Sequence, residues 1–139
     1  MNQELSIYTD GGSRGNPGKA ASAAVVYDSA GKLRFICGKY LGIATNNIAE
    51  YTAVEIALER VQAQLGEAAK STQLRFFTDS NLVASQLSGK FKIKNPEIAK
   101  KVTQIRNQEK NFQVVSYQHI PREKNFAADS EVNRILDQS

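Results

Sequence analysis

Apolar and polar positions in the first forty residues predict three short strands. Residues 5–10 alternate apolar with polar side chains and lead into Gly11-Gly12, so we expect a strand that ends at Asp10. Residues 20–27 and 33–40 form two further β-type runs, separated by a break at Gly31. These spacings are too short for crossover helices, so we predict a β-meander.

The period changes after Gly42. Apolar residues then recur every three or four positions, which predicts an amphipathic helix with Asn46 or Asn47 as its N-cap: Tyr51, Val54, Leu58, Val61 and Leu65. The apolar run 74–78 fits a buried strand, and Asp79-Ser80 would open a short helix that reaches Leu87. Because a helix connects the two, this strand should pair in parallel.

The rest of the chain predicts two more helices and one more strand. Pro96 suits a first helical turn, and the helix should run to about residue 107. Residues 112–119 fit a last strand, and a final helix after Pro121 carries an apolar face. The fold class is therefore α/β, a mixed sheet with helices on its faces, in a single domain spanning residues 1–139.

Composition narrows the class of protein. A chain of 139 residues with 41% hydrophobic and 23% charged residues matches one globular domain and excludes disordered or collagen-like chains. With one cysteine, Cys37, and one histidine, neither a disulfide framework nor a Cys/His zinc site can form, so a metal would bind oxygen. No long apolar run or signal-peptide pattern is present, so we expect a cytoplasmic protein with no membrane association.

The charge distribution leaves two interpretations open. The net charge is +4, and residues 89–110 carry seven basic residues against two acidic ones. This segment could contact a polyanion. It could equally be a solvated helix face.

Four carboxylates occupy positions that suggest a shared site. Asp10 and Asp79 follow predicted strands, at the edge where open α/β sheets bind ligands. Glu50 and Asp129 lie near the start of predicted helices, next to their apolar faces. Four converging acids would repel one another unless cations neutralised them, and Mg²⁺ prefers such oxygen ligands. Taken singly, each acid could instead cap a helix or form a surface ion pair.

Two other features carry weaker signals. The glycine-rich segment 11–19 fails as a P-loop because Ser13 and Ala20 stand where Gly and Ser or Thr are required. A hairpin connection with glycines at positive φ would explain the glycines. His119 could be a hydrogen-bonded surface residue or, beside a metal site, a proton shuttle.

Segments 8–18, 45–51, 78–80 and 119–129, in this order, resemble the type 1 ribonuclease H family. The resemblance implies a five-stranded mixed sheet, made of a three-strand antiparallel meander plus two parallel strands. It also implies endonucleolytic cleavage of the RNA strand of RNA/DNA hybrids, leaving 5′-phosphate and 3′-hydroxyl ends. The implied cofactor is Mg²⁺, with Mn²⁺ possible, as two ions per site with substrate bound; the implied partner is the hybrid, bound by a monomer without protein partners.

The same resemblance assigns roles to individual residues. The four metal-binding acids of the family fall on Asp10, Glu50, Asp79 and Asp129, and its proton-transferring histidine falls on His119. Thr45 is similar to a residue that binds a phosphate of the DNA strand. The implied substrate contacts are Gly11, Gly12, Ser13, Asn16, Thr45, Asn46, Asn47, Ser80, Asn81 and Asn125.

The chain also departs from the family pattern. It has no Trp and only the short segment 88–108 where many members carry a basic protrusion, so hybrid binding should be weaker and strongly salt-dependent. Ser130 and Glu131 replace small or apolar residues of the family. Two alternatives remain: a non-catalytic nucleic-acid-binding module of the same fold, and a related nuclease that also acts on double-stranded RNA.

Overall fold

The computed structural model describes residues 3–90 and 92–139 and contains one five-stranded mixed sheet. The strand order is β3-β2-β1-β4-β5. The pairs β1–β2 and β2–β3 are antiparallel. The pairs β1–β4 and β4–β5 are parallel. This confirms the predicted fold class, with strands β1 (Gln3–Gly15), β2 (Gly18–Asp28), β3 (Leu33–Ala44), β4 (Thr72–Thr78) and β5 (Val114–His119).

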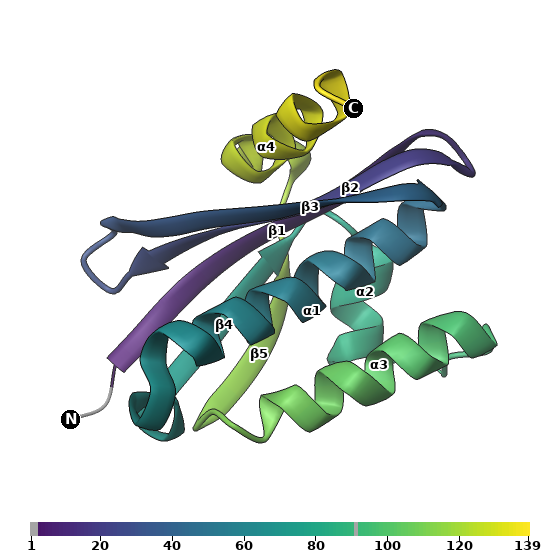
Figure 1. The fold of residues 1–139 in the computed structure, drawn as a ribbon. Coiled ribbons are helices and arrows are strands. Elements are labelled where there is room, and N and C mark those ends of the chain that lie inside the picture. The colour runs from purple at the N-terminus through teal and green to yellow at the C-terminus, as the bar shows by residue number, and fades with distance from the viewer. Residues whose placement is uncertain (1–2, 91) are drawn as a thin grey trace.

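Helices cover both faces of this sheet (Figure 1). On one face α1 (Asn46–Leu65) lies across β1, β2 and β3, α2 (Asn81–Leu87) lies against β4 and β5, and α3 (Pro96–Glu109) packs on α1. On the opposite face α4 (Phe126–Asp137) contacts β1, β2 and β3. Short 3-10 turns follow α1 (Gly66–Ser71) and precede α4 (Arg122–Lys124).

The larger apolar core lies between the sheet and α1. Its centre includes Ile7, Tyr51, Leu58 and Phe76, none more than 1% exposed. A smaller cluster under α4 joins Val132 and Leu136 to alanines of β2. Apolar area removed from water, at about 25 cal/mol per Å², is the main stabilising contribution in both layers.

β1 is longer than the sequence pattern predicts, and the expectation that it ends at Asp10 is wrong. Its parallel pairing with β4 stops at Thr9, opposite Thr78, but its antiparallel pairing with β2 continues to Gly15, opposite Gly18. Asp10 therefore marks the point where β1 loses one of its two neighbours. Of the glycines in segment 11–19, only Gly15 has a positive φ, at 97°, so the predicted hairpin conformation applies there alone.

The N-cap of α1 is Thr45, which corrects the prediction of Asn46 or Asn47. The Thr45 hydroxyl accepts a hydrogen bond from the Ile48 amide at 3.2 Å. Asn46 is engaged elsewhere, because its side-chain Oδ1 accepts from the Ser13 amide at 2.8 Å. The short α2 is capped as predicted near Asp79-Ser80, with the Ser80 hydroxyl accepting from the Val83 amide.

Candidate active site

The register of the sheet places Asp10 beside Asp79. Thr9 and Thr78 are partners in the parallel β1–β4 ladder, and the two aspartates are the next residues on their chains. Successive side chains of a strand point to opposite faces. Leu5 and Ile7 face the α1 side, so Asp10 is directed to the opposite face, where α4 begins.

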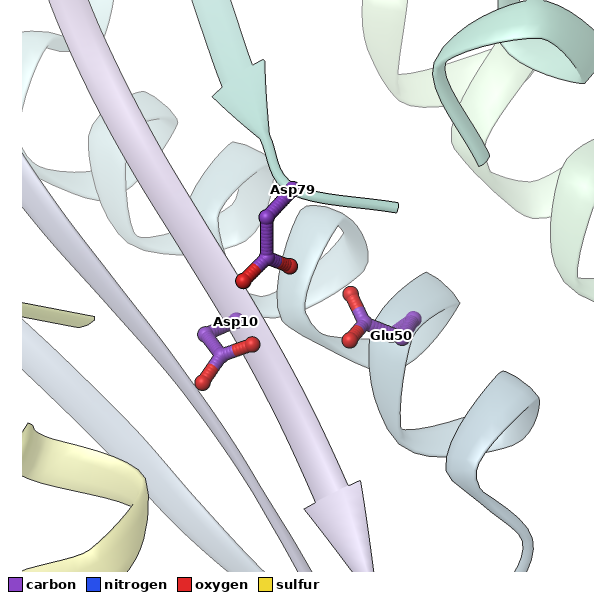
Figure 2. A group of neighbouring side chains, drawn as sticks. All are labelled: Asp10, Glu50 and Asp79. Carbon is purple, nitrogen blue, oxygen red and sulfur yellow. The ribbon is translucent and has the colours of Figure 1, made fainter. Parts of the chain in front are cut away.

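Glu50 reaches the same point from α1 because this helix lies unusually close to β1. A Cβ added to Gly11 would lie 2.2 Å from the Ala49 carbonyl carbon, so only glycine permits this approach. The Ser22 hydroxyl of β2 also donates to the Ala49 carbonyl at 2.6 Å. Figure 2 shows the outcome: the carboxylates of Asp10, Glu50 and Asp79 converge, with one oxygen from each within 4.8 Å of the others.

Asp129 lies at the rim of this group. It occupies the first turn of α4, is half-buried and lines the same cleft as the other three acids. Its position depends on Asn125, whose buried side-chain amide donates to the Thr9 carbonyl at 2.9 Å and so fastens the start of α4 to β1. With 1% of its surface exposed, Asn125 is better placed to position α4 than to touch a substrate.

The electrostatics of the site favour protonation when no cation is present. Burial, followed by repulsion from Asp79 and Asp129, raises the pKa of Asp10 from 3.8 to about 7. Burial and the charge of Asp10 raise the pKa of Glu50 well above its usual value. Burial also raises the pKa of Asp79, although the Arg122 guanidinium opposes this.

These residues fit a divalent cation. The Glu50 Oε2 atom is buried and has no hydrogen-bond partner in the structure, so this carboxylate oxygen lacks the donor that a buried acceptor normally has. Three carboxylates that meet within 4.8 Å and resist ionisation provide the hard oxygen donors that Mg²⁺ or Mn²⁺ requires. A bound cation would stabilise the ionised form of all three.

The residues assigned to substrate binding by the family resemblance fall mainly into two clefts beside the start of α1. Gly11, Gly12, Ser13, Asn46 and Ser80 line the cleft with the acids. Asn16, Thr45 and Asn47 line a second cleft, together with Lys92 and Lys94. Asn81 is exposed at the start of α2.

The two interpretations of the basic segment each hold for part of it. Lys92 and Lys94 face the second cleft. Further along, Lys101 pairs with Glu55 of α1 at 3.2 Å, and Arg106 pairs with Glu109 at 2.9 Å. The first part of the segment is thus available to a polyanion, while this part of α3 forms ion pairs with the protein itself.

His119 is exposed at the end of β5, opposite Thr78 in the ladder and thus at the same edge of the sheet as Asp79. The cleft around the acids also contains Arg14, Arg122 and Asn133, which the sequence analysis did not assign. Arg122 lies in the segment that joins His119 to Asp129. Its position between two candidate site residues is the sequence signal that could have identified it as a residue of the cleft.

This fold, with carboxylates gathered where β1 and β4 part, defines a ribonuclease H-like domain. The sequence model of the reverse transcriptase-like family matches residues 8–135, and the chain belongs to that family.

Individual relatives agree with this assignment. The crystal structure of LC11-RNase H1 in complex with RNA/DNA hybrid superimposes with a TM-score of 0.91 at 37% identity, covering 96% of this chain and 97% of that one. The crystal structure of RNase H1 from Halobacterium salinarum superimposes with a TM-score of 0.89 at 36% identity, covering 98% of this chain and 99% of that one. The resemblance to type 1 ribonuclease H is thereby confirmed.

Among curated sequences, Ribonuclease HI of Halobacterium salinarum is 39% identical over 130 residues, which is 94% of this chain and 63% of that protein. Bifunctional protein Rv2228c of Mycobacterium tuberculosis is 36% identical over 94% of this chain, which spans only 35% of that protein's length. In the described residues, no helix has the length and apolar character needed to cross a membrane.

Proposed function

We propose that this chain is a ribonuclease H that hydrolyses the RNA strand of RNA/DNA hybrids, leaving 5′-phosphate and 3′-hydroxyl ends. The observation that carries the proposal is the convergence of Asp10, Glu50 and Asp79 at the edge of the sheet. The hybrid-bound relative with a TM-score of 0.91 supports the substrate class. A module that only binds nucleic acid would gain nothing from clustered negative charge near phosphates.

In this proposal Asp10, Glu50 and Asp79 hold divalent ions with Asp129 at the rim, the ions being two Mg²⁺, or Mn²⁺, when substrate is present. Such ions supply activation of the attacking water and stabilisation of the leaving oxygen. The chain's own contribution is to fix these carboxylates on β1, on α1 and directly after β4. His119, exposed at the same sheet edge, transfers a proton and assists product release.

Recognition of the hybrid is assigned to the two clefts. Ser13, Asn46 and Asn16 form one connected set. The Asn46 side-chain Oδ1 accepts from the Ser13 backbone N–H, and the Asn46 backbone N–H donates to the Asn16 Oδ1 at 3.1 Å. Such a set, held in one geometry, suits the minor groove of the hybrid, where 2′-hydroxyls distinguish RNA from DNA. Thr45, Lys92 and Lys94 then face the DNA strand. We also propose that the enzyme acts as a monomer in the cytoplasm.

The test compares a labelled RNA/DNA hybrid with matched double-stranded RNA and double-stranded DNA, in Mg²⁺, in Mn²⁺ and in EDTA. Asp10→Asn protein serves as the control for a contaminating nuclease. We expect metal-dependent cutting of the RNA strand of the hybrid alone. Cutting of double-stranded RNA as well would support the wider-specificity alternative, and absence of cutting by folded protein would support the binding module.

A further inference from the structure

Ser22 is a polar residue in the most deeply buried part of β2. It lies within residues 20–26, all of which are buried and all others of which are alanine or valine, and its own side chain is fully buried. A buried hydroxyl is costly unless it has a hydrogen-bond partner. The Ser22 hydroxyl donates to the Ala49 carbonyl at 2.6 Å, a contact between residues 27 positions apart. It therefore joins β2 to the first turn of α1.

Ser22 and Gly11 together hold that carbonyl group. The two residues are direct partners in the antiparallel β1–β2 ladder. A Cβ at Gly11 would overlap the Ala49 carbonyl group, so the glycine leaves the space that the carbonyl occupies. Ser22 supplies the hydrogen bond to its oxygen. This pair of residues therefore fixes where the first turn of α1 lies on the sheet.

Glu50 depends on this contact because it is the residue that follows Ala49. Its Oε2 atom is buried and has no hydrogen-bond partner among the described residues, so no donor holds that oxygen in place. The backbone of α1 must then determine where the carboxylate lies. The two aspartates are positioned independently of α1, by the paired strands β1 and β4. A shift of the first turn of α1 would therefore move Glu50 relative to both of them.

We propose that Ser22 is a positioning residue of this site: by fixing the Ala49 carbonyl, it holds the Glu50 carboxylate where it can share a divalent cation with the two aspartates. The inference rests on the metal site of the proposed ribonuclease H function, but its test needs no nucleic acid. A competing explanation is that the hydrogen bond stabilises the fold and leaves the site unaffected. The two explanations differ in what loss of the hydroxyl does to metal binding.

The experiment measures Mn²⁺ binding at pH 8 from the electron paramagnetic resonance signal of free Mn²⁺, and thermal unfolding in EDTA. Ser22→Ala removes the hydroxyl from a position that already has alanine on both sides. Thr72→Val is the matched control, because the buried Thr72 hydroxyl also donates to a carbonyl, that of Ala68, at 2.7 Å. Thr72 begins β4, at the opposite end of this strand from Asp79.

We expect both variants to lower the melting temperature by a similar amount, about 4 °C, because each loses one buried hydrogen bond. Only Ser22→Ala should weaken Mn²⁺ binding, by about tenfold, as when the outer partner of a metal-binding group is removed. In a Glu50→Gln background, Ser22→Ala should have no further effect on Mn²⁺ affinity. Unchanged affinity in Ser22→Ala, an equal loss in Thr72→Val, or a full effect in the Glu50→Gln background overturns the inference.

If Ser22→Ala does not fold, Ser22→Cys in a Cys37→Ala background takes its place, because a thiol is a weaker donor than a hydroxyl. Cys37 is removed because it lies opposite Ala24, two residues from Ser22, and could otherwise form a disulfide. Mn²⁺ affinity equal to that of Cys37→Ala alone would then overturn the inference. If the wild-type protein binds Mn²⁺ but does not cut the hybrid, the proposed function fails and the inference stands. If it binds no Mn²⁺, the metal site fails and the inference fails with it.

Discussion

Gly11 of β1 and Ala49 of α1 touch through their backbones, and the contact leaves no room for a side chain. A Cβ at position 11 would lie 2.2 Å from the Ala49 carbonyl carbon and 2.5 Å from the Glu50 nitrogen. Because Glu50 follows Ala49, this contact sets the distance between the carboxylate of α1 and those of the sheet. A glycine in a strand thereby controls the geometry of the site.

Gly11→Ala should destabilise the protein by about 3 kcal/mol or more and reduce cleavage strongly, because α1 must shift away from β1 and carry Glu50 with it. Gly12→Ala is the matched control for stability, since its Cβ would meet Val132 Cγ1 at an ordinary 3.8 Å. Denaturant unfolding of both variants provides the measurement. Equal losses of unfolding free energy in the two variants would refute the close-approach explanation.

Asp10→Asn should stabilise the metal-free protein at pH 8 and change it little near pH 4. The carboxyl titrates near 3.8 when unfolded and at about 7 when folded, so the folded state binds more protons between these values. Its stabilising contribution is complete below pH 3.8 and is lost as the pH rises through about 7, which amounts to up to about 4 kcal/mol. Thermal unfolding in EDTA across this range measures the effect, and a wild-type melting temperature that rises from pH 5 to pH 8 relative to the variant would contradict it.

Mg²⁺ or Mn²⁺ should raise the melting temperature at pH 8 and have little effect at pH 5. At the lower pH the raised pKa values of Asp10 and Glu50 keep protons on the groups that must bind the ion. At one hundred times the dissociation constant, a single ion adds about 2.7 kcal/mol. Asp10→Asn protein serves as the comparison, and an equal shift in both proteins would place the ion elsewhere.

His119→Ala should slow cleavage by about a hundredfold without abolishing it, and should leave the melting temperature unchanged because the side chain is exposed. The carboxylates remain in place in this variant, so the residual activity should still require metal. Single-turnover cleavage compared with Asp10→Asn tests the assignment. A complete loss equal to that of Asp10→Asn would show that the two residues do not have the separate roles proposed.

The sequence pattern predicted the order and type of the helices and strands because each has a period, a compact apolar run or a helix-start signal, and it predicted the convergence of Asp10, Glu50 and Asp79. It did not predict element ends that are determined by tertiary contacts. The end of β1 could not be placed because the glycine-rich segment continues to pair with β2 while β4 has already ended. Thr45 caps α1 because the hairpin of β1 and β2 engages Asn46, a contact over 33 residues that local spacing does not reveal.

Asn125 and Arg122 illustrate the same limit at the site. Both lie in one short segment, and the family resemblance assigned only Asn125 to substrate contact. In the fold Asn125 is buried against the Thr9 carbonyl, whereas Arg122 is exposed at the wall of the acid cleft. Burial, which depends on how α4 docks on the sheet, decides which of them can meet a ligand.

β1 loses its pairing with β4 at Asp10. This divides the strand into two parts whose backbone amides differ in protection from hydrogen exchange. From Leu5 to Thr9 it lies between two partner strands, and opening that part requires the sheet itself to separate. Beyond Asp10 it is paired with β2 alone, so amide hydrogens there should exchange with deuterium sooner. Asp10 is the first residue past the doubly paired part, and Gly11 after it is held against Ala49 of α1. Any adjustment of this strand to a substrate should therefore be confined to the residues beyond Gly11.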